Sequence, residues 1–181
     1  MTSLLHELTD LSALSTPNAI AIRYRQETYT YSTFQTSINQ FSHALIDLGT
    51  NRQERVAVYL PKQYETVVSI FGAVSAGCVF VPINPILKPS QVEHILRDCN
   101  VRVLVTSSDR LNLLKETLSA CHDLRHVILI DKPINQPDTP VTPYALSNFQ
   151  DLIVAAPRAK KHRVIDTDMA AILYTSGSTG K

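Results

Sequence analysis

The sequence has no tryptophan, only five glycines and three cysteines, and almost no net charge. Its 17 basic and 16 acidic residues give a formal net charge of +1, so no overall field draws nucleic acid or an anionic membrane to it. No apolar run approaches the roughly 20 residues of a membrane span, and the first residues lack the basic start of a signal peptide. We therefore expect no nucleic-acid partner and no membrane span, and any ligand must be recognised at a specific site.

The three cysteines, Cys78, Cys99 and Cys121, lie far apart and form no CxxC pair that would hold zinc or a redox centre. We expect them to be free thiols in buried or half-buried positions, because reduced cysteine prefers the interior. Free thiols favour a cytoplasmic protein. The six histidines also lack the paired spacing of metal ligands, so no metal site is predicted from this chain.

What the sequence does contain is a repeated alternation of strand and helix patterns. Nearly continuous apolar, β-branched runs typical of buried strands occupy residues 55–60, 78–83, 101–106 and 126–130. Helical patterns lie between them, at residues 63–76, 90–99 and 109–120, the second opened by a Ser90-x-x-Glu93 capping box. Strand, helix, strand in succession predicts an α/β fold with a doubly wound, mostly parallel sheet covered on both faces.

An N-terminal helix and a hairpin are expected before this sheet. Five leucines between residues 4 and 14 recur at helical spacing and predict a short amphipathic helix that packs on the body. Alternating residues on both sides of Gln26 and Glu27 predict a two-stranded hairpin. A second helix is expected from Ser32, which stands three residues before Gln35, to Gly49, where glycine accepts the left-handed conformation.

The alternation of strand and helix patterns stops at residues 131–147. We interpret this segment as a Pro-rich loop within the domain, because proline removes backbone donors. A short helix at residues 148–155 and a basic, solvated turn at residues 157–164 are expected next. A final strand at residues 170–174 then leads into the string TSGSTGK.

This last string has the composition of a phosphate-binding loop. Glycines allow several amide groups to converge on one anion, hydroxyl groups add donors, and lysine adds a charge. It does not fit the Walker pattern, because Thr175 stands where that pattern needs glycine, and a GxSxG nucleophile turn would need one more residue. A simple turn remains the alternative, since the same residue types dominate turns.

The context of the string resembles one enzyme superfamily. ILYTSGSTGK at residues 172–181 is similar to the phosphate loop of the AMP-forming adenylating enzymes, in which x-Pro-Lys-Gly normally follows. Three further segments look like consecutive blocks of that superfamily, at residues 29–49, 55–85 and 89–109. Within the superfamily, the segments at residues 59–73, 79–107 and 164–180 most resemble bacterial acyl-CoA ligases associated with exosortase and exopolysaccharide loci.

The resemblance implies a reaction. Such enzymes use ATP and Mg²⁺ to adenylate a carboxylic acid with loss of pyrophosphate, and then transfer the acyl group to a thiol, commonly coenzyme A or a carrier-protein thiol. The resemblance also implies nucleotide-binding residues in this chain, and assigns them to the β and γ phosphates with Lys181 as a supplementary cation. These residues are Thr175, Ser176, Gly177, Ser178, Thr179, Gly180 and Lys181.

The resemblance further implies that residues 1–181 are the N-terminal portion of the large AMP-binding domain, ending just after the phosphate loop. No catalytic residue can be identified in the chain, because the remaining catalytic parts of the superfamily lie further along. We therefore expect the chain alone to be inactive. A peptide-synthetase adenylation domain and a non-catalytic nucleotide-binding or interaction module remain alternatives.

Overall fold

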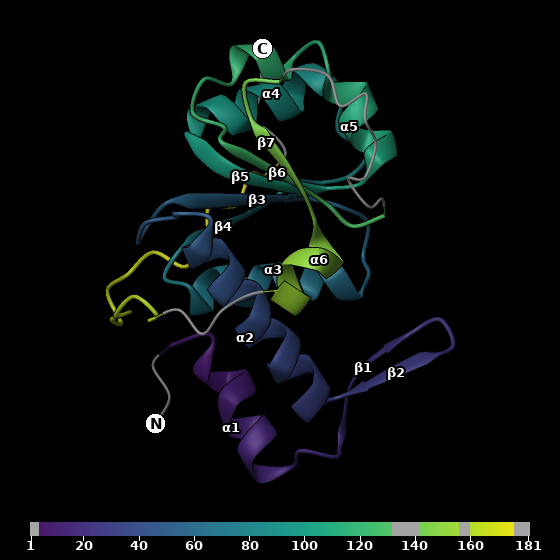
Figure 1. The fold of residues 1–181 in the computed structure, drawn as a ribbon, viewed down its shortest axis with the longest axis vertical. Helices are drawn as coiled ribbons and strands as arrows, with labels where there is room; N and C mark the ends of the chain where they lie inside the picture. The colour runs from purple at the N-terminus through teal and green to yellow at the C-terminus, as the bar shows by residue number, and fades with distance from the viewer. Residues whose placement is uncertain (1–3, 132–141, 156–159, 176–181) are drawn as a thin grey trace.

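The computed structural model describes residues 4–131, 142–155 and 160–175. It shows an α/β fold around a parallel sheet with the strand order β4-β3-β5-β6-β7 (Figure 1). The strands are β3 (Arg55–Tyr59), β4 (Val79–Pro82), β5 (Val101–Thr106), β6 (His126–Leu129) and β7 (Ala145–Asn148). The predicted fold class and the first four predicted strands are therefore confirmed.

Helices cover both faces of the sheet, as its two-sided apolar strands predict. One face packs against α2 (Tyr31–Asp47), α3 (Tyr64–Ser75) and α6 (Phe149–Ala155), and the other against α4 (Pro89–Asp98) and α5 (Ser108–Leu114). Alternate residues of β3 enter opposite cores: Val56 and Val58 lie on the α2 side, and Ala57 and Tyr59 on the α4 side. The expected helix at 109–120 is split into α5 and a 3-10 turn at Leu118–Ala120.

Two expected helix starts are wrong, although the expected end of the second helix at Gly49 is confirmed. The side chain of Thr30, not Ser32, caps α2 by accepting the amide of Thr33 at 3.2 Å. Helix α4 begins at Pro89, where the side chain of Gln91 accepts the amide of Lys88 at 3.0 Å, so the Ser90 and Glu93 box is not formed. A proline fits the first helical position because its missing donor is not needed there. Gly49 and Gly77 both have φ 80°.

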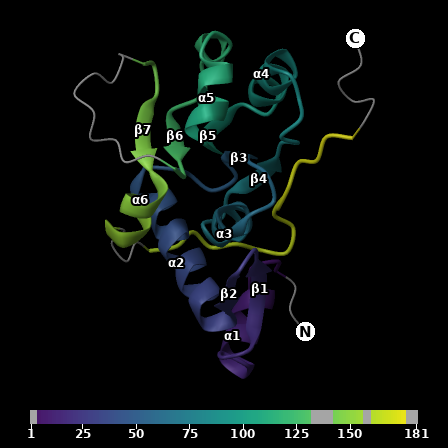
Figure 2. The same ribbon diagram turned by 90° about the vertical axis from the view of Figure 1, so that its right-hand side faces the viewer.

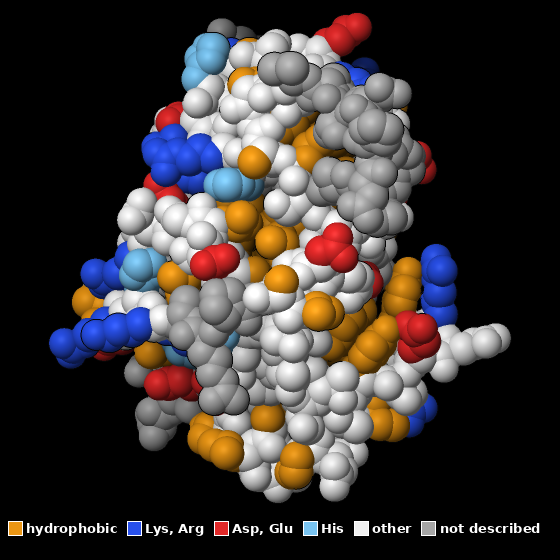
Figure 3. All heavy atoms as spheres, viewed as in Figure 1, with side chains coloured by type: hydrophobic (Ala, Val, Ile, Leu, Met, Phe, Trp, Pro, Cys, Tyr) orange, Lys and Arg blue, Asp and Glu red, His pale blue; other side chains and the backbone are white. Residues whose placement is uncertain are grey.

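The N-terminal elements lie at one end of the molecule. Strands β1 (Ile20–Tyr24) and β2 (Glu27–Thr30) form the expected antiparallel hairpin, with its turn at Arg25 and Gln26. Helix α1 (Glu7–Ser15) is present, but its leucine stripe does not pack on the body: Leu8, Leu11 and Leu14 are 52%, 52% and 80% exposed. The buried residue of α1 is Thr9 instead, and Gln35 of α2 donates a hydrogen bond to the carboxylate of Asp10. Hydrophobic side chains are visible at this end in Figure 3.

The end of the chain differs from expectation in two further ways. Residues 145–148 form β7 and pair in parallel with β6, although residues 145–147 were expected in the Pro-rich loop and Asn148 in the helix that follows. Residues 132–141 of that loop lie outside the described part of the structure. The expected strand at 170–174 is a single parallel bridge between Ala171 and Phe80 of β4. The last described residues therefore hold to the sheet edge by very few backbone bonds, and their position depends on other contacts.

Candidate functional site

The candidate site lies at the end of an extended segment, residues 160–175, that we call the strap. The strap starts beside α2 and α3, passes the β4 edge of the sheet and rises beside α4 (Figure 2). It therefore connects the two helical layers before it delivers Thr175. Of the predicted phosphate-loop residues, Thr175 is described and exposed, whereas Ser176, Gly177, Ser178, Thr179, Gly180 and Lys181 lie outside the described residues.

The first contact of the strap is a half-buried lysine. Nζ of Lys161 donates to Oδ1 of Asn39 in α2 at 2.7 Å and to Oγ of Ser75 in α3 at 2.8 Å. Burial lowers the pKa of Lys161 below its ordinary value. Next to it, a ring nitrogen of His162 lies 3.1 Å from the carbonyl oxygen of Thr50. The expected solvated basic turn is therefore wrong at these two positions, where the side chains fasten the strap to the body.

The middle of the strap is held at the loop before β3. Arg52 forms a two-point ion pair with Asp168, and Nε of Arg52 lies 3.0 Å from Oδ2 of that carboxylate. Hydrogen bonding from Arg52 lowers the pKa of Asp168. Nε2 of Gln53 also donates to the carbonyl of Met169 at 3.3 Å. These contacts guide the chain to the β4 edge, where Phe80 exchanges backbone hydrogen bonds with Ala170 and Ile172 at 3.0 and 3.1 Å.

The last anchor lies immediately before Thr175. The hydroxyl of Tyr174 donates to the carboxylate of Asp98, the last residue of α4, and lies 3.2 Å from Sγ of Cys99. The ring also packs against the core on the α4 side of the sheet. A cavity of about 380 Å³ opens beside it, lined in part by Gln53, Arg55 and Tyr174. Tyr174 thus connects the start of the predicted phosphate loop to a helix end.

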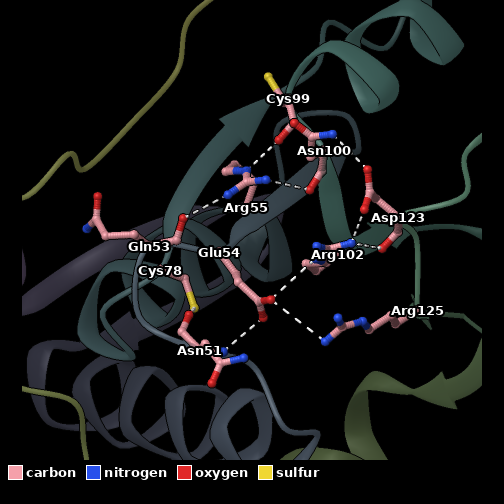
Figure 4. Close-up of polar contacts among 10 residues, drawn as sticks. All are labelled: Asn51, Gln53, Glu54, Arg55, Cys78, Cys99, Asn100, Arg102, Asp123 and Arg125. Carbon is pink, nitrogen blue, oxygen red and sulfur yellow. Dashed lines mark hydrogen bonds and ion pairs between the residues drawn. The ribbon is translucent and has the colours of Figure 1, made fainter.

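A polar network at the amino ends of the strands supports that helix end (Figure 4). Arg55 of β3 donates to the carbonyl groups of Cys99 and Asn100, the latter at 2.9 Å, in the turn between α4 and β5. Asn100 has φ 48° and donates to Asp123 at 2.7 Å. Its short polar side chain suits this left-handed position.

The same network ties β3, β5 and β6 together. Glu54 receives ion pairs from Arg102 and Arg125, with N to O distances of 3.3 and 3.7 Å, and Arg102 also pairs with Asp123. Glu54 additionally accepts the amide of Asn51 at 2.9 Å. Sequence reasoning missed this network, because each arginine stands beside an apolar run and only the strand order brings them together. Their position one residue before or inside a predicted strand was the available signal.

The cysteine prediction is confirmed: all three thiols are buried and free. Burial raises the pKa of Cys78 and of Cys121 to about 11. Among the described residues, no group of three or more histidine, cysteine or acidic side chains is placed to hold a metal ion. Within the same residues, no helix has the length and apolar character needed to cross a membrane.

Comparison with known proteins gives a consistent family match. The model of a family described as AMP-binding enzyme matches residues 10–181. Gramicidin S synthase 2 from Brevibacillus brevis is 28% identical over 177 residues, which are 98% of this chain and 3% of that protein. Malpinin synthetase from Mortierella alpina is 28% identical over 181 residues, which are 99% of this chain and 2% of that protein. The chain thus spans only a small part of these curated relatives.

Solved structures show the same relationship at the level of the fold. The anthranilate CoA ligase AuaEII, solved in complex with anthranoyl-AMP, superimposes with a TM-score of 0.84 and 26% identity, over 98% of this chain and 33% of that one. The R395G form of coronafacic acid ligase from Pectobacterium brasiliense shares the fold with a TM-score of 0.85 at 16% identity, over 97% of this chain and 34% of that one. The chain spans about a third of these solved proteins.

Proposed function

The chain belongs to the AMP-binding enzyme family, and from this we propose that it supplies the N-terminal part of the large domain of an AMP-forming adenylating ligase. In the proposed reaction a carboxylate oxygen of the acid attacks the α-phosphorus of ATP. The bond between the α-phosphorus and the bridging oxygen breaks, and pyrophosphate leaves with that oxygen. The acyl group then passes to a thiol, and AMP is released. The observation that supports this most directly is the family match, which extends over the glycine loop.

Within this reaction we assign residues 175–180 to the leaving pyrophosphate. Their amide and hydroxyl groups would hold the β and γ phosphates in line with the attacking oxygen, and Lys181 would add a positive charge. Bound Mg²⁺ supplies further neutralisation of the phosphate charge. The strap supports the assignment, because Lys161 bonds α2 and Tyr174 bonds α4, and these side-chain contacts hold the segment that leads to Thr175.

For the thiol acceptor, we propose coenzyme A, with a cytoplasmic location supported by three unpaired thiols. The likeness to an anthranilate CoA ligase supports this choice, as does the sequence resemblance to exosortase-associated ligases. A peptide-synthetase adenylation domain is the second candidate. It is supported by the curated relatives, which include gramicidin S synthase 2 and tyrocidine synthase 3, and its acceptor would be a carrier-protein thiol.

Exchange of labelled pyrophosphate into ATP tests the adenylation step directly. The protein translated from the complete reading frame should catalyse exchange in the presence of its acid, whereas residues 1–181 alone should not. Formation of an acyl-CoA or of an acylated carrier protein by the complete protein then decides between the two acceptors. Absence of exchange with every acid, together with tight nucleotide binding by the 181-residue chain, would instead favour a non-catalytic nucleotide-binding module.

A point variant tests the assigned site. Thr179→Ala should lower exchange roughly tenfold or more, because a hydrogen bond to a charged group contributes about 1.5–3 kcal/mol. Ser119→Ala is the matched control: it also removes one hydroxyl, but from an exposed side chain that bonds only the carbonyl of Glu116 in the contacts described. Equal exchange by the two variants would contradict the assignment.

A further inference from the structure

Tyr174 makes its contacts just after the strap's last described backbone hydrogen bond to the sheet. Ala171 is the final residue of the strap with a bridge to the sheet, and the amide of Ile172 makes the last backbone bond to Phe80. Two residues later the hydroxyl of Tyr174 reaches Asp98 and Cys99, and Thr175 follows directly. The orientation of the Tyr174 side chain is therefore coupled to the direction in which Thr175 points.

Asp98 is an unfavourable residue for its position. A carboxylate in the last turn of a helix lies at the negative end of the helix dipole, where cations are preferred. Local choices that oppose helix stability concentrate at functional sites. The Asp98 carboxylate accepts a hydrogen bond from the Tyr174 hydroxyl. The acidic group is thus explained by its contact with the strap and not by α4.

The end of α4 is a firm attachment point. Val92, Ile95 and Leu96 are buried, and the amide of Cys99 continues the helix by donating to Ile95 at 3.0 Å. Arg55 then holds the carbonyl groups that follow, as described above. Burial of its ring, and then the bond to Asp98, raise the pKa of Tyr174 above its ordinary value. The hydroxyl therefore keeps its proton and remains the donor.

We propose that Tyr174 is a positioning residue: its bond to Asp98 sets the point and direction at which the chain enters the phosphate loop. The proposal rests on the adenylation reaction proposed above and adds that alignment of the leaving pyrophosphate depends on α4. Small displacements of groups that align reactants cost up to about 100-fold in rate. Loss of the hydroxyl should therefore slow the chemical step and leave the acid site intact.

The test compares Tyr174→Phe with Tyr64→Phe in the complete protein. Both changes remove a hydroxyl that bonds another side chain, but Tyr64 donates to Ser37 at 2.9 Å on the opposite face of the sheet. We expect Tyr174→Phe to lower kcat for ATP–pyrophosphate exchange about tenfold, with KM for the acid within twofold. Tyr64→Phe should stay within twofold in both constants. A merely structural role for Tyr174 would lower the melting temperature without this change in kcat.

Changes at Asp98 test the coupling. Asp98→Ala should reproduce the kcat loss of Tyr174→Phe, and the double variant should be no slower than either single variant, since both remove one interaction. Asp98→Asn keeps an oxygen acceptor and should recover most of the rate. Multiplicative losses in the double variant, or kcat of Tyr174→Phe equal to that of Tyr64→Phe, would overturn the proposal.

Hydrogen exchange at residues 170–175 gives a readout that does not require activity. Exchange should accelerate in Tyr174→Phe and Asp98→Ala, but not in Tyr64→Phe. If the unsubstituted protein shows no pyrophosphate exchange with any acid, the proposed function fails, and hydrogen exchange alone decides whether Tyr174 positions the loop. Unchanged exchange rates in that case would overturn the positioning role as well.

Discussion

Gly72 in α3 permits the close approach of α2, and its replacement by alanine gives a quantitative test of that packing. A Cβ atom at this position would lie 2.7 Å from Cδ1 and 3.2 Å from Cβ of Phe41, and 3.3 Å from the carbonyl oxygen of Ile38. Phe41 is fully buried and stacks on Phe149 with ring centroids 5.1 Å apart. Neither the ring nor the backbone oxygen can therefore move away cheaply.

The expected magnitude follows from two opposing terms. Alanine gains about 1 kcal/mol over glycine as a helix former. Overpacking a close-packed core costs about 1–3 kcal/mol, and the upper end applies because backbone as well as side chain must shift. The net expectation for Gly72→Ala is a loss of about 1–2 kcal/mol in the free energy of unfolding. For a chain of this length that corresponds to a fall of roughly 2–8 °C in Tm.

Thermal unfolding followed by circular dichroism measures this change in Tm. Making the same substitution in a variant that already carries Phe41→Leu identifies its cause. In Phe41→Leu, which removes the ring atom at 2.7 Å, Gly72→Ala should cost less than in the unsubstituted chain, because only the looser contacts at 3.2 and 3.3 Å then oppose the helix term. Gly49→Ala is the control for backbone strain without a clash, since its φ is 80° and its added Cβ would meet no atom within 4 Å. A Tm for Gly72→Ala equal to or above that of the unsubstituted chain would refute the packing argument.

Three further outcomes are expected. Thr30→Ala should cost about 1 kcal/mol in urea unfolding through loss of the α2 cap, whereas Ser32→Ala should cost much less; equal costs would contradict the assignment. Hydrogen bonds from Asn100 and then Arg102 lower the pKa of Asp123. This contribution to the free energy of unfolding is present above the ordinary pKa of 3.8 and is lost as pH falls through the lower pKa of the folded state. Asp123→Asn should therefore make the free energy of unfolding depend less on pH in this acidic range. An unchanged pH dependence would refute the reasoning. A thiol-specific disulfide reagent at pH 8 should modify Cys78 and Cys121 slowly until urea unfolds the chain; rapid labelling of the folded protein would show that they are accessible.

The parallel sheet was predictable because its strands carry an unambiguous signal. Residues such as those of β3 and β6 are apolar on both faces, which only a covered sheet explains. Strand β7 was missed because its sequence, ALSN, has no such run and follows three prolines within eight residues. Its place in the sheet comes from pairing with β6, a tertiary effect that overrides weak local preference.

Helix boundaries were less predictable than helices, for a local reason. Thr30 and Ser32 are both competent capping residues, and only the backbone geometry selects Thr30, which is extended with ψ 164°. The prediction that the α1 leucines pack on the body was wrong for a different reason. Helical spacing of leucines shows that a helix can have an apolar face, but it does not show that another part of the chain packs against that face. The glycine loop was recognisable from its string, but its anchors were not, because Lys161 and Tyr174 bond residues that lie 75 or more positions away in the sequence.

The anchors explain how a weakly paired segment can present a loop accurately. A central strand is fixed by its ladder, but the strap makes one bridge to β4, so side chains must set its path. Lys161 fastens it to the α2 and α3 layer, and Tyr174 fastens it to the end of α4. The two helical layers pack on opposite faces of the same sheet. The position of Thr175, where the loop begins, therefore depends on contacts with both layers. A change in either layer is therefore expected to alter the loop before it unfolds the domain.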